Sequence, residues 1–233
     1  MLHLIICLFI LISIKLGWTY WRRQRQLKPV RDWYGQLNLA AHESAFYDLY
    51  QTVNGFQISH AARKAQDAFA YTYGEIEFRH FVALLSLAHP NTQTVFYDLG
   101  SGIGKAVFAC AMVFPVQKSV GVEILLPLHL TACQQKNRLR HLPQYAAIAD
   151  KIELRHADFL ETGLEDATLI FINATAFFSP LWEELGARLH QLTSLQTVIT
   201  TSRSLTIPSF HIQIQTQVQM SWGIVTAFVH QRN

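Results

Sequence analysis

The sequence predicts an α/β fold in which a mainly parallel β-sheet carries helices on both faces. From residue 94 onward, apolar runs typical of strands alternate with helical segments in the order β-α-β-α-β-β-α-β-β-β. A glycine-rich turn, Asp98-Leu-Gly-Ser-Gly-Ile-Gly104, directly follows the first of these strands. The chain has 233 residues, which is enough for one such domain with a sizeable core.

The individual elements follow from periodicity and from helix-ending residues. Short helices are expected over 43–53 and 59–66, then an aromatic-rich loop over 67–75 and a helix over 75–87. The alternating part is expected to comprise strand 94–98, helix 103–113, strand 118–122, helix 125–139, strands 151–156 and 167–172, helix 180–191 and strand 195–201. Two last strands, 210–219 and 224–230, form a hairpin-like pair across Ser221-Trp-Gly223.

The N-terminal segment predicts a membrane anchor. Residues 2–21 form an apolar run, interrupted by Lys15, that is long enough to span a bilayer. The five basic residues at 22–31 indicate a cytoplasmic flank and suit anionic lipid headgroups. A buried core helix is the alternative. We expect a single-pass membrane protein with three parts: an anchor (1–21), a basic linker with a helical cap (22–66) and a cytoplasmic main domain (67–233).

Charge and cysteine usage argue against two other classes of protein. The net charge of +3 is supplied by the basic residues at 22–31, so the main domain lacks the basic stripe of a nucleic-acid binder. We therefore expect no direct nucleic-acid binding. The three cysteines, Cys7, Cys110 and Cys133, have no regular spacing, and neither a disulfide framework nor a metal site is expected.

Acidic residues end three successive predicted strands. Asp98 precedes the glycine turn, and Glu123 follows about 20 residues later, where a carboxylate can bind ribose hydroxyls. Asp158 and Phe159 suit an adenine, through a hydrogen bond and ring stacking, although a turn or capping role is the alternative for Asp158. Because ligands of open α/β sheets bind at the carboxyl ends of strands, these residues indicate one nucleoside site.

The glycine turn differs from two better-known phosphate-binding loops. A dinucleotide loop requires G-x-G-x-x-G, and a P-loop requires G-x-x-x-x-G-K-[ST]. Here the glycines are Gly100, Gly102 and Gly104, and Ala106 stands where the P-loop needs a hydroxyl. Asp98 would repel a pyrophosphate but suits a cationic amino-acid group. A glycine turn that binds no ligand is the remaining alternative.

The segment after the fourth strand suggests a site for an amine. The carbonyl of Asn173 can orient an amine, and Phe177 and Phe178 can wall an apolar channel. A turn asparagine followed by two core aromatics is the alternative.

These motifs together resemble a known family, the disruptor-of-telomeric-silencing ("Dot-one") histone lysine methyltransferases. The resemblance covers about residues 67–230 and includes the stretches Phe96–Lys105, Lys118–Leu125, Asp158–Leu160, Leu169–Asn173 and Phe228–His230. Its more specific parts are Tyr73-Gly-Glu75 and the Asn-x-x-Ala-Phe pattern that begins at Asn173.

The resemblance implies a seven-stranded class I, Rossmann-like fold and a protein-lysine N-methyltransferase in the cytoplasmic domain. The implied cofactor is S-adenosylmethionine (SAM), the implied partner is a protein that carries a lysine, and no metal is implied. The implied cofactor-binding residues are Tyr73, Glu75, Asp98, Gly100, Ser101, Gly102, Gly104, Glu123, Asp158, Phe159 and Asn173. The implied catalytic residues are Asn173, Tyr73, Phe177 and Trp222, with the last two framing the lysine channel.

The chain also departs from the family pattern. Ala174 stands where the family has a second asparagine, Ile76 replaces a hydroxyl residue, and the family's long helical N-terminal region and basic DNA-binding segment are missing. Two other functions therefore stay open: a methyltransferase acting on a small molecule or a lipid, and a non-catalytic SAM-binding module.

Overall fold

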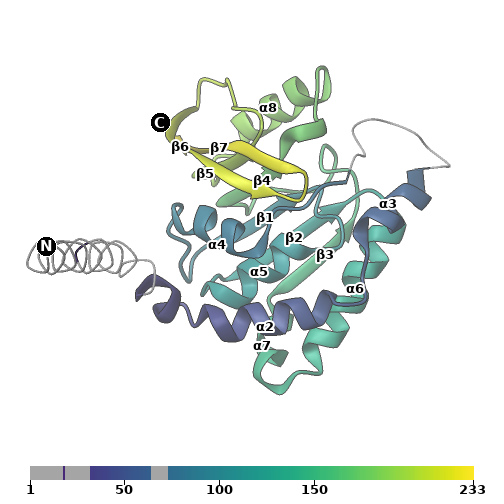
Figure 1. The fold of residues 1–233 in the computed structure, drawn as a ribbon. Helices are drawn as coiled ribbons and strands as arrows, with labels where there is room; N and C mark the ends of the chain where they lie inside the picture. Colours follow the sequence, from purple (N-terminus) through teal and green to yellow (C-terminus); the bar gives the residue numbers. More distant parts are fainter. Residues whose placement is uncertain (1–17, 19–31, 64–72) are drawn as a thin grey trace, which may run out of the picture. The chain divides into compact units, whose positions relative to one another are not determined.

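The computed structural model of the chain describes Trp18 and residues 32–63 and 73–233 (Figure 1). The chain divides into two compact units, Met1–Ala41 and His42–Asn233. In the first unit, residues 32–36 are helical. All the functional residues discussed below belong to the second unit.

The second unit is built on a seven-stranded sheet with the strand order β3-β2-β1-β4-β5-β7-β6. The strands are β1 (Val95–Leu99), β2 (Lys118–Glu123), β3 (Ile152–His156), β4 (Leu169–Asn173), β5 (Thr197–Thr201), β6 (Phe210–Met220) and β7 (Gly223–Arg232). Strands β1 to β5 pair in parallel, and β7 is antiparallel to both β5 and β6. The chain order reverses between β1 and β4, which is where open α/β sheets bind their ligands. The predicted seven-stranded Rossmann-like sheet is thus confirmed.

The helices follow the predicted order with small shifts at their ends. They are α2 (Leu39–Tyr50), α3 (Gly55–Arg63), α4 (Phe78–Ser86), α5 (Lys105–Val113), α6 (Leu126–Arg140), α7 (Ala146–Asp150) and α8 (Leu181–Gln191). Two short 3₁₀ turns lie at Pro143–Tyr145 and Ala174–Ala176. The turn at Pro143–Tyr145 and the short α7 between α6 and β3 were not predicted.

Both faces of the sheet are covered, as the buried pattern of β1 requires. Tyr97 of β1 packs into a core cluster with Leu185 and Leu189 of α8. Because neighbouring residues of a strand point to opposite faces, Phe96 lies on the other side of the sheet. There its ring packs against Phe81 of α4, with ring centroids 6.2 Å apart. Figure 1 shows α4 and α5 on one side of the sheet and α8 on the other.

The prediction of an N-terminal transmembrane helix requires correction. No helix in the described part of the chain is long and apolar enough to cross a membrane. The predicted single-pass membrane localisation and the predicted lipid partners fall with it. Residues 1–21, on which the prediction rested, lie outside the described residues apart from Trp18. Apolar length was its main basis, and Lys15 within that run opposes insertion, because a charged side chain costs free energy in a bilayer.

Candidate functional site

The glycine loop that joins β1 to α5 adopts a backbone that only glycine accepts readily. Gly100, Gly102 and Gly104 have φ angles of 84°, 55° and 85°. The loop is fastened to β2, because the N–H groups of Gly100 and Ser101 both donate to the carbonyl of Val122, at 2.9 and 3.0 Å. A Cβ atom on Gly102 would come within 2.5 Å of the Tyr73 ring, so the close approach of the Tyr73 segment requires glycine here.

Asp98, near the end of β1, is a buried carboxyl group with no hydrogen-bond partner among the described residues. Its residue is 4 % exposed, and none of the described residues donates a hydrogen bond to its carboxylate. Burial, and to a smaller extent the charge of Glu123, raises the pKa of Asp98 to about 8. A cationic hydrogen-bond donor from a ligand would relieve this penalty, so Asp98 fits a positively charged ligand group.

Glu123, the last residue of β2, is also buried but is held by the backbone. Its two carboxylate oxygens accept hydrogen bonds from the N–H groups of Gly102 at 2.8 Å and Leu125 at 2.7 Å. Burial raises the pKa of Glu123, and these hydrogen bonds oppose the rise. Each carboxylate oxygen can accept a further hydrogen bond, so Glu123 can still bind a pair of hydroxyls.

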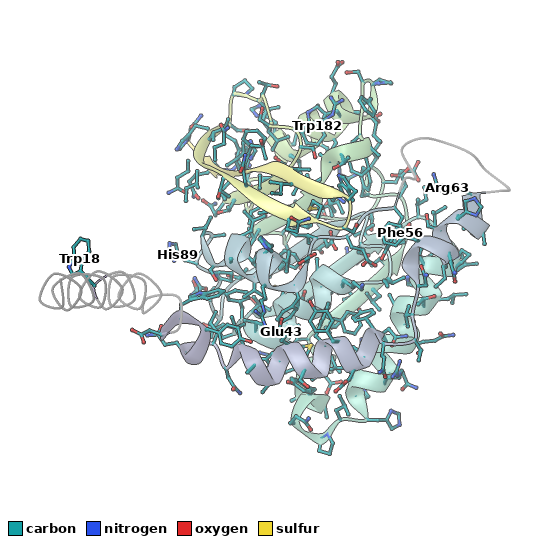
Figure 2. All side chains as sticks on the ribbon, viewed as in Figure 1. Trp18, Glu43, Phe56, Arg63, His89 and Trp182 are labelled. Carbon is teal, nitrogen blue, oxygen red and sulfur yellow. The ribbon has the colours of Figure 1, made fainter. Side chains whose placement is uncertain are left out.

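The segment Tyr73–Glu77 lies over the glycine loop and is locked to α5 by an ion pair. Lys105 Nζ lies 2.6 Å from Glu75 Oε2, while the hydroxyl of Tyr73 donates to Glu75 Oε1 at 2.6 Å. Burial, reinforced by the charge of Glu75, raises the pKa of Tyr73 well above its ordinary value. Phe56 of α3, labelled in Figure 2, packs edge-on against the Tyr73 ring at 5.1 Å. Sequence reasoning missed Lys105 in this network.

The same segment is joined to the hairpin of β6 and β7. The N–H of Ser221 donates to the carbonyl of Glu75 at 2.8 Å, and the N–H of Glu77 donates to the carbonyl of Gln219 at 3.2 Å. Trp222 lies directly on Gly74, where an added Cβ would meet the indole ring at 2.0 Å. The hairpin therefore holds the covering segment in place from outside.

Two hollows meet at the Glu75–Lys105 ion pair. The inner cavity has a volume of about 40 Å³, and its lining residues are Tyr73, Gly74, Glu75, Ile76, Asp98, Gly100, Ser101, Lys105, Ala106, Phe171 and Asn173. The outer hollow, of about 410 Å³, is lined by residues 51–56 together with Glu75 and Lys105. The inner cavity holds little more than a water molecule or two, whereas a cofactor site needs several hundred Å³.

Asn173, at the end of β4, lines the inner cavity and is held on every side. Its Nδ2 donates to the carbonyl of Gly74 at 3.3 Å, and its Oδ1 accepts from Thr175 at 3.0 Å and Thr201 at 2.8 Å. The orientation of the amide is assigned from this network. Sequence reasoning missed both threonines. The hydroxyl-rich end of the neighbouring strand at 200–202 was the available signal.

The remaining predicted residues lie around the site but not in its inner cavity. Oδ1 of Asp158 accepts the N–H of Leu160 at 2.8 Å, which is the geometry of the turn-forming alternative. Phe159 packs against Phe177 with ring centroids 5.3 Å apart. Phe177 is buried and faces Gly100 rather than the cavity near Asn173. These residues therefore form an apolar flank beside the glycine loop.

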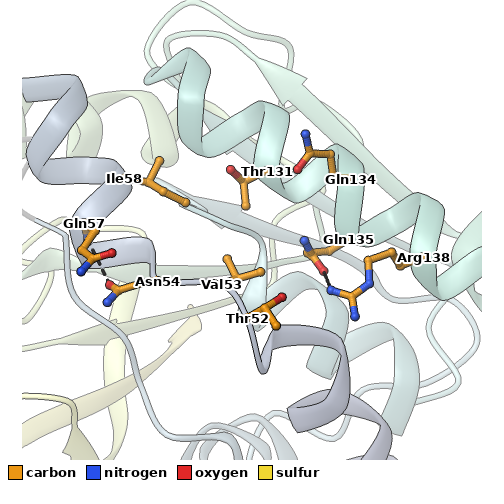
Figure 3. Close-up of a pocket in the computed structure, with 9 residues that line it drawn as sticks. All are labelled: Thr52, Val53, Asn54, Gln57, Ile58, Thr131, Gln134, Gln135 and Arg138. Atoms are coloured by element: carbon orange, nitrogen blue, oxygen red, sulfur yellow. Dashed lines mark hydrogen bonds between the residues drawn. The ribbon is translucent and has the colours of Figure 1, made fainter.

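A further hollow lies between α3 and α6 (Figure 3). It has a volume of about 430 Å³, and Arg138 in its lining donates to Gln135 at 3.0 Å. None of the predicted site residues borders it, but it shares Thr52, Val53 and Asn54 with the outer hollow, so the two hollows are neighbours.

Comparisons with known proteins identify the family of the chain. The model of the family "Histone methylation protein DOT1" matches residues 57–226. A Caenorhabditis elegans protein, "Histone-lysine N-methyltransferase, H3 lysine-79 specific", is 31% identical over 140 residues, which cover 58% of this chain. The match spans only 15% of that relative's length.

Solved structures with the same fold have lower sequence identity. A Streptococcus pneumoniae protein described as a tRNA (m1A22) methyltransferase, in complex with SAM, aligns with a TM-score of 0.53 and 16% identity over 68% of this chain and 73% of its own. A Streptococcus agalactiae protein of the NADB-Rossmann superfamily aligns with a TM-score of 0.50 and 12% identity over 66% of this chain and 68% of its own. These likenesses show the fold alone. The match to the family model over most of the chain shows more: the chain belongs to the DOT1 family of histone methylation proteins.

Proposed function

We propose that this chain is a protein-lysine N-methyltransferase of the DOT1 type. The observation that carries the proposal is the buried Asp98 carboxylate, which has no partner among the described residues and shares a small cavity with Asn173. A cationic amino-acid group satisfies such a carboxylate, and an amide close by can orient an amine. When bound, SAM supplies an electrophilic methyl group on a sulfonium.

The chain's residues fit this cofactor in the order of the parallel strands. Asp98 would accept hydrogen bonds from the ammonium group, while the left-handed glycines allow the backbone to approach the ligand closely. Glu123 would accept from the ribose hydroxyls, and Phe159 would cover the adenine. The carboxylate of Asp158 is already engaged by Leu160, so its contact with the adenine amine would use its second oxygen.

Cofactor entry in this proposal requires the Glu75–Lys105 ion pair to open. Both residues of the pair line the inner cavity of about 40 Å³ and the outer hollow of about 410 Å³. Both side chains are partly buried, at 17% and 26% exposed, so the pair is less screened than a surface ion pair. Closure of the segment after binding would exclude water from the methyl group, which favours transfer to an amine over hydrolysis.

The lysine would reach the site as a neutral amine beside Asn173. Burial of a lysine in an apolar channel lowers its pKa, which supplies the lone pair that forms the new N–C bond as the S–C bond breaks. Oδ1 of Asn173 already accepts two hydroxyls, but Thr175 also lies 2.8 Å from Ser202 Oγ. The Thr175 hydroxyl can therefore turn to Ser202 and leave Oδ1 free to orient the amine. Trp222, which is 45% exposed and lies on Gly74, would guide the lysine stem.

The test uses the full chain with SAM carrying a labelled methyl group. Histone H3 and nucleosomes are the first acceptors to try, because the C. elegans relative is named for lysine 79 of histone H3. Label on a lysine of the protein fraction, identified by mass spectrometry, supports the proposal. Label only in the organic extract would instead indicate a small-molecule or lipid acceptor, and SAM binding without turnover would indicate a binding module.

A pair of variants separates chemistry from cofactor binding. Asn173→Ala is expected to reduce turnover at least about 10-fold while calorimetric SAM binding persists. Glu123→Ala is expected to weaken SAM binding itself, and Asn137→Ala, on the exposed face of α6, serves as the matched control. Unchanged turnover in Asn173→Ala would remove Asn173 from the mechanism.

A further inference from the structure

The outer strand of the sheet, β6, lacks the charged residues and prolines that usually protect a sheet edge. Its 11 residues, Phe210–Met220, include no Asp, Glu, Lys, Arg or Pro. Edge strands normally carry such residues, because their unpaired backbone groups recruit other strands. The opposite edge strand, β3, does carry them, since Glu153 and Arg155 form an ion pair at 2.6 Å. The two edges of this sheet therefore differ in their readiness to pair.

The free backbone groups of β6 can be identified from its contacts. The carbonyl of Gln219 accepts from Glu77, and its N–H donates to His80 Nδ1 at 3.3 Å, so both groups of Gln219 point away from β7. Backbone groups alternate in direction along a strand, and the pairing with β7 is regular from Ile214 to Met220. Gln217 and Gln215 must therefore also direct their N–H and C=O outward. No described residue pairs with them.

The sequence of this edge is nearly the same in both directions. Read outward from Thr216, Gln215 matches Gln217, Ile214 matches Val218 and Gln213 matches Gln219. An antiparallel copy centred on Thr216 would thus place glutamine opposite glutamine and one β-branched apolar residue opposite another. The side chains of Gln213, Gln215 and Gln217 are exposed, and a glutamine amide can donate to and accept from its own kind.

We propose that β6 pairs with β6 of a second copy of the chain, in antiparallel orientation about a two-fold axis at Thr216. Such a contact is self-complementary, as a two-fold dimer requires. Gln215 would exchange both backbone hydrogen bonds with Gln217 of the partner subunit, and the symmetry repeats the exchange. The dimer joins the two seven-stranded sheets into one continuous sheet.

The ends of the contact are set by features of the fold. Pairing with β7 is irregular between Ile212 and Ile214, where a bulge interrupts the strand. At the other end, Glu77 already occupies the position beside Gln219. Regular pairing therefore extends over residues 214–218. A contact of this length is smaller than the interfaces of obligate dimers, so the dimer forms reversibly and depends on protein concentration.

The experiment is sedimentation velocity of the full chain over a concentration series. The wild-type protein is expected to show a concentration-dependent monomer–dimer equilibrium. The double variant Gln215→Lys/Gln217→Lys places lysine opposite lysine and is expected to stay monomeric. Gln215→Lys/Gln217→Glu places opposite charges in both cross-strand pairs and is expected to restore the dimer. Gln191→Lys/Gln196→Lys adds the same charge at exposed sites away from β6 and is expected to behave as wild type.

A cross-link tests the register directly. Thr216 lies on the proposed axis at a non-hydrogen-bonded position, where opposed Cα atoms are close enough for a disulfide. Thr216→Cys is expected to form a covalent dimer on oxidation, well above the wild-type background, and circular dichroism verifies that each variant is folded. A wild-type chain that stays monomeric throughout the series overturns the proposal. A dimer that survives the Lys/Lys change, or is not restored by Lys/Glu, overturns it as well.

Discussion

The raised pKa of Asp98 predicts a pH dependence of protein stability that can be measured without substrate. In the folded chain without cofactor its pKa is about 8, against an ordinary value of 3.8, mainly because the carboxyl is buried. Near neutral pH the folded state therefore holds a proton that the unfolded chain has released. The stability associated with Asp98 is fully present below about pH 4 and is lost as the pH rises toward 8. Asparagine has nearly the same shape and no such proton, so Asp98→Asn escapes this loss.

The size of the effect follows from the two pKa values. Each pH unit between them contributes about 1.4 kcal/mol, and about three such units separate 3.8 from neutral pH, which gives an upper limit of about 4 kcal/mol at pH 7. Relaxation of the site and entry of water reduce this figure. We therefore expect the free energy of unfolding of Asp98→Asn, relative to that of the wild type, to be about 2 kcal/mol higher at pH 7 than at pH 4. The same variant should bind SAM about 10- to 100-fold more weakly, because it loses a charge-assisted hydrogen bond.

Urea unfolding of cofactor-free protein at several pH values measures the effect, and calorimetry measures SAM binding. Asp166→Asn is the matched control, because the pKa of Asp166 is shifted in the opposite direction to that of Asp98. Despite some burial, the hydrogen bonds of Asp166 with Lys118 and Tyr97 lower its pKa, so its stabilising contribution is present above its unfolded pKa. The reasoning is refuted if the free energies of unfolding of Asp98→Asn and wild type differ by the same amount at every pH from about 4 to about 8.

Three further variants test the geometry of the site and its support. Gly102→Ala should lose SAM binding and about 1–2 kcal/mol of stability, because the φ of Gly102 is 55° and the added Cβ would lie 2.5 Å from Tyr73. Gly35→Ala is the control, because nothing lies near the added Cβ, and it should change neither SAM binding nor stability. Thr201→Val removes one hydrogen bond to Asn173 and should lower kcat about 10-fold with SAM affinity unchanged. An equal loss of kcat in Thr200→Val would contradict a specific role of Thr201 in positioning Asn173. Phe81→Ala should cost about 3–5 kcal/mol in chemical denaturation, because the ring is 1% exposed; a loss below about 1 kcal/mol would contradict its place in the core.

Much of the fold was predictable because the signals were local. The predicted strand 118–122 and helix 125–139 differ by one residue at their ends from β2 and α6. The short helix α7 was missed because its five residues carry too little periodicity to stand out from a loop. The transmembrane prediction failed because it rested mainly on the apolar length of one segment.

The site was predictable where strand ends bring residues together and unpredictable where side chains cross between elements. The proximity of Asp98 and Glu123 was predictable because parallel strands place their carboxyl ends on one edge. The ion pair of Glu75 with Lys105 joins residues 30 positions apart, and the hydroxyl of Thr201 reaches Asn173 from the neighbouring strand. No sequence spacing predicts such contacts. The packing of Phe177 against Phe159 was not predicted either, because an aromatic run does not reveal which ring faces inward. The channel role of Phe177 stays a prediction.

The hydrogen bonds of the covering segment to the β6–β7 hairpin have a consequence for local unfolding. The hydrogen bonds Ser221–Glu75 and Glu77–Gln219, with the isolated bridge between Ile76 and Met220, attach residues 75–77 to the end of the hairpin. This segment and the tip of the hairpin should therefore open as one cooperative unit and not as an independent flap. Hydrogen–deuterium exchange at the amides of Glu77 and Ser221 would then proceed at a common rate. That rate would measure how often the covering segment lifts from the glycine loop.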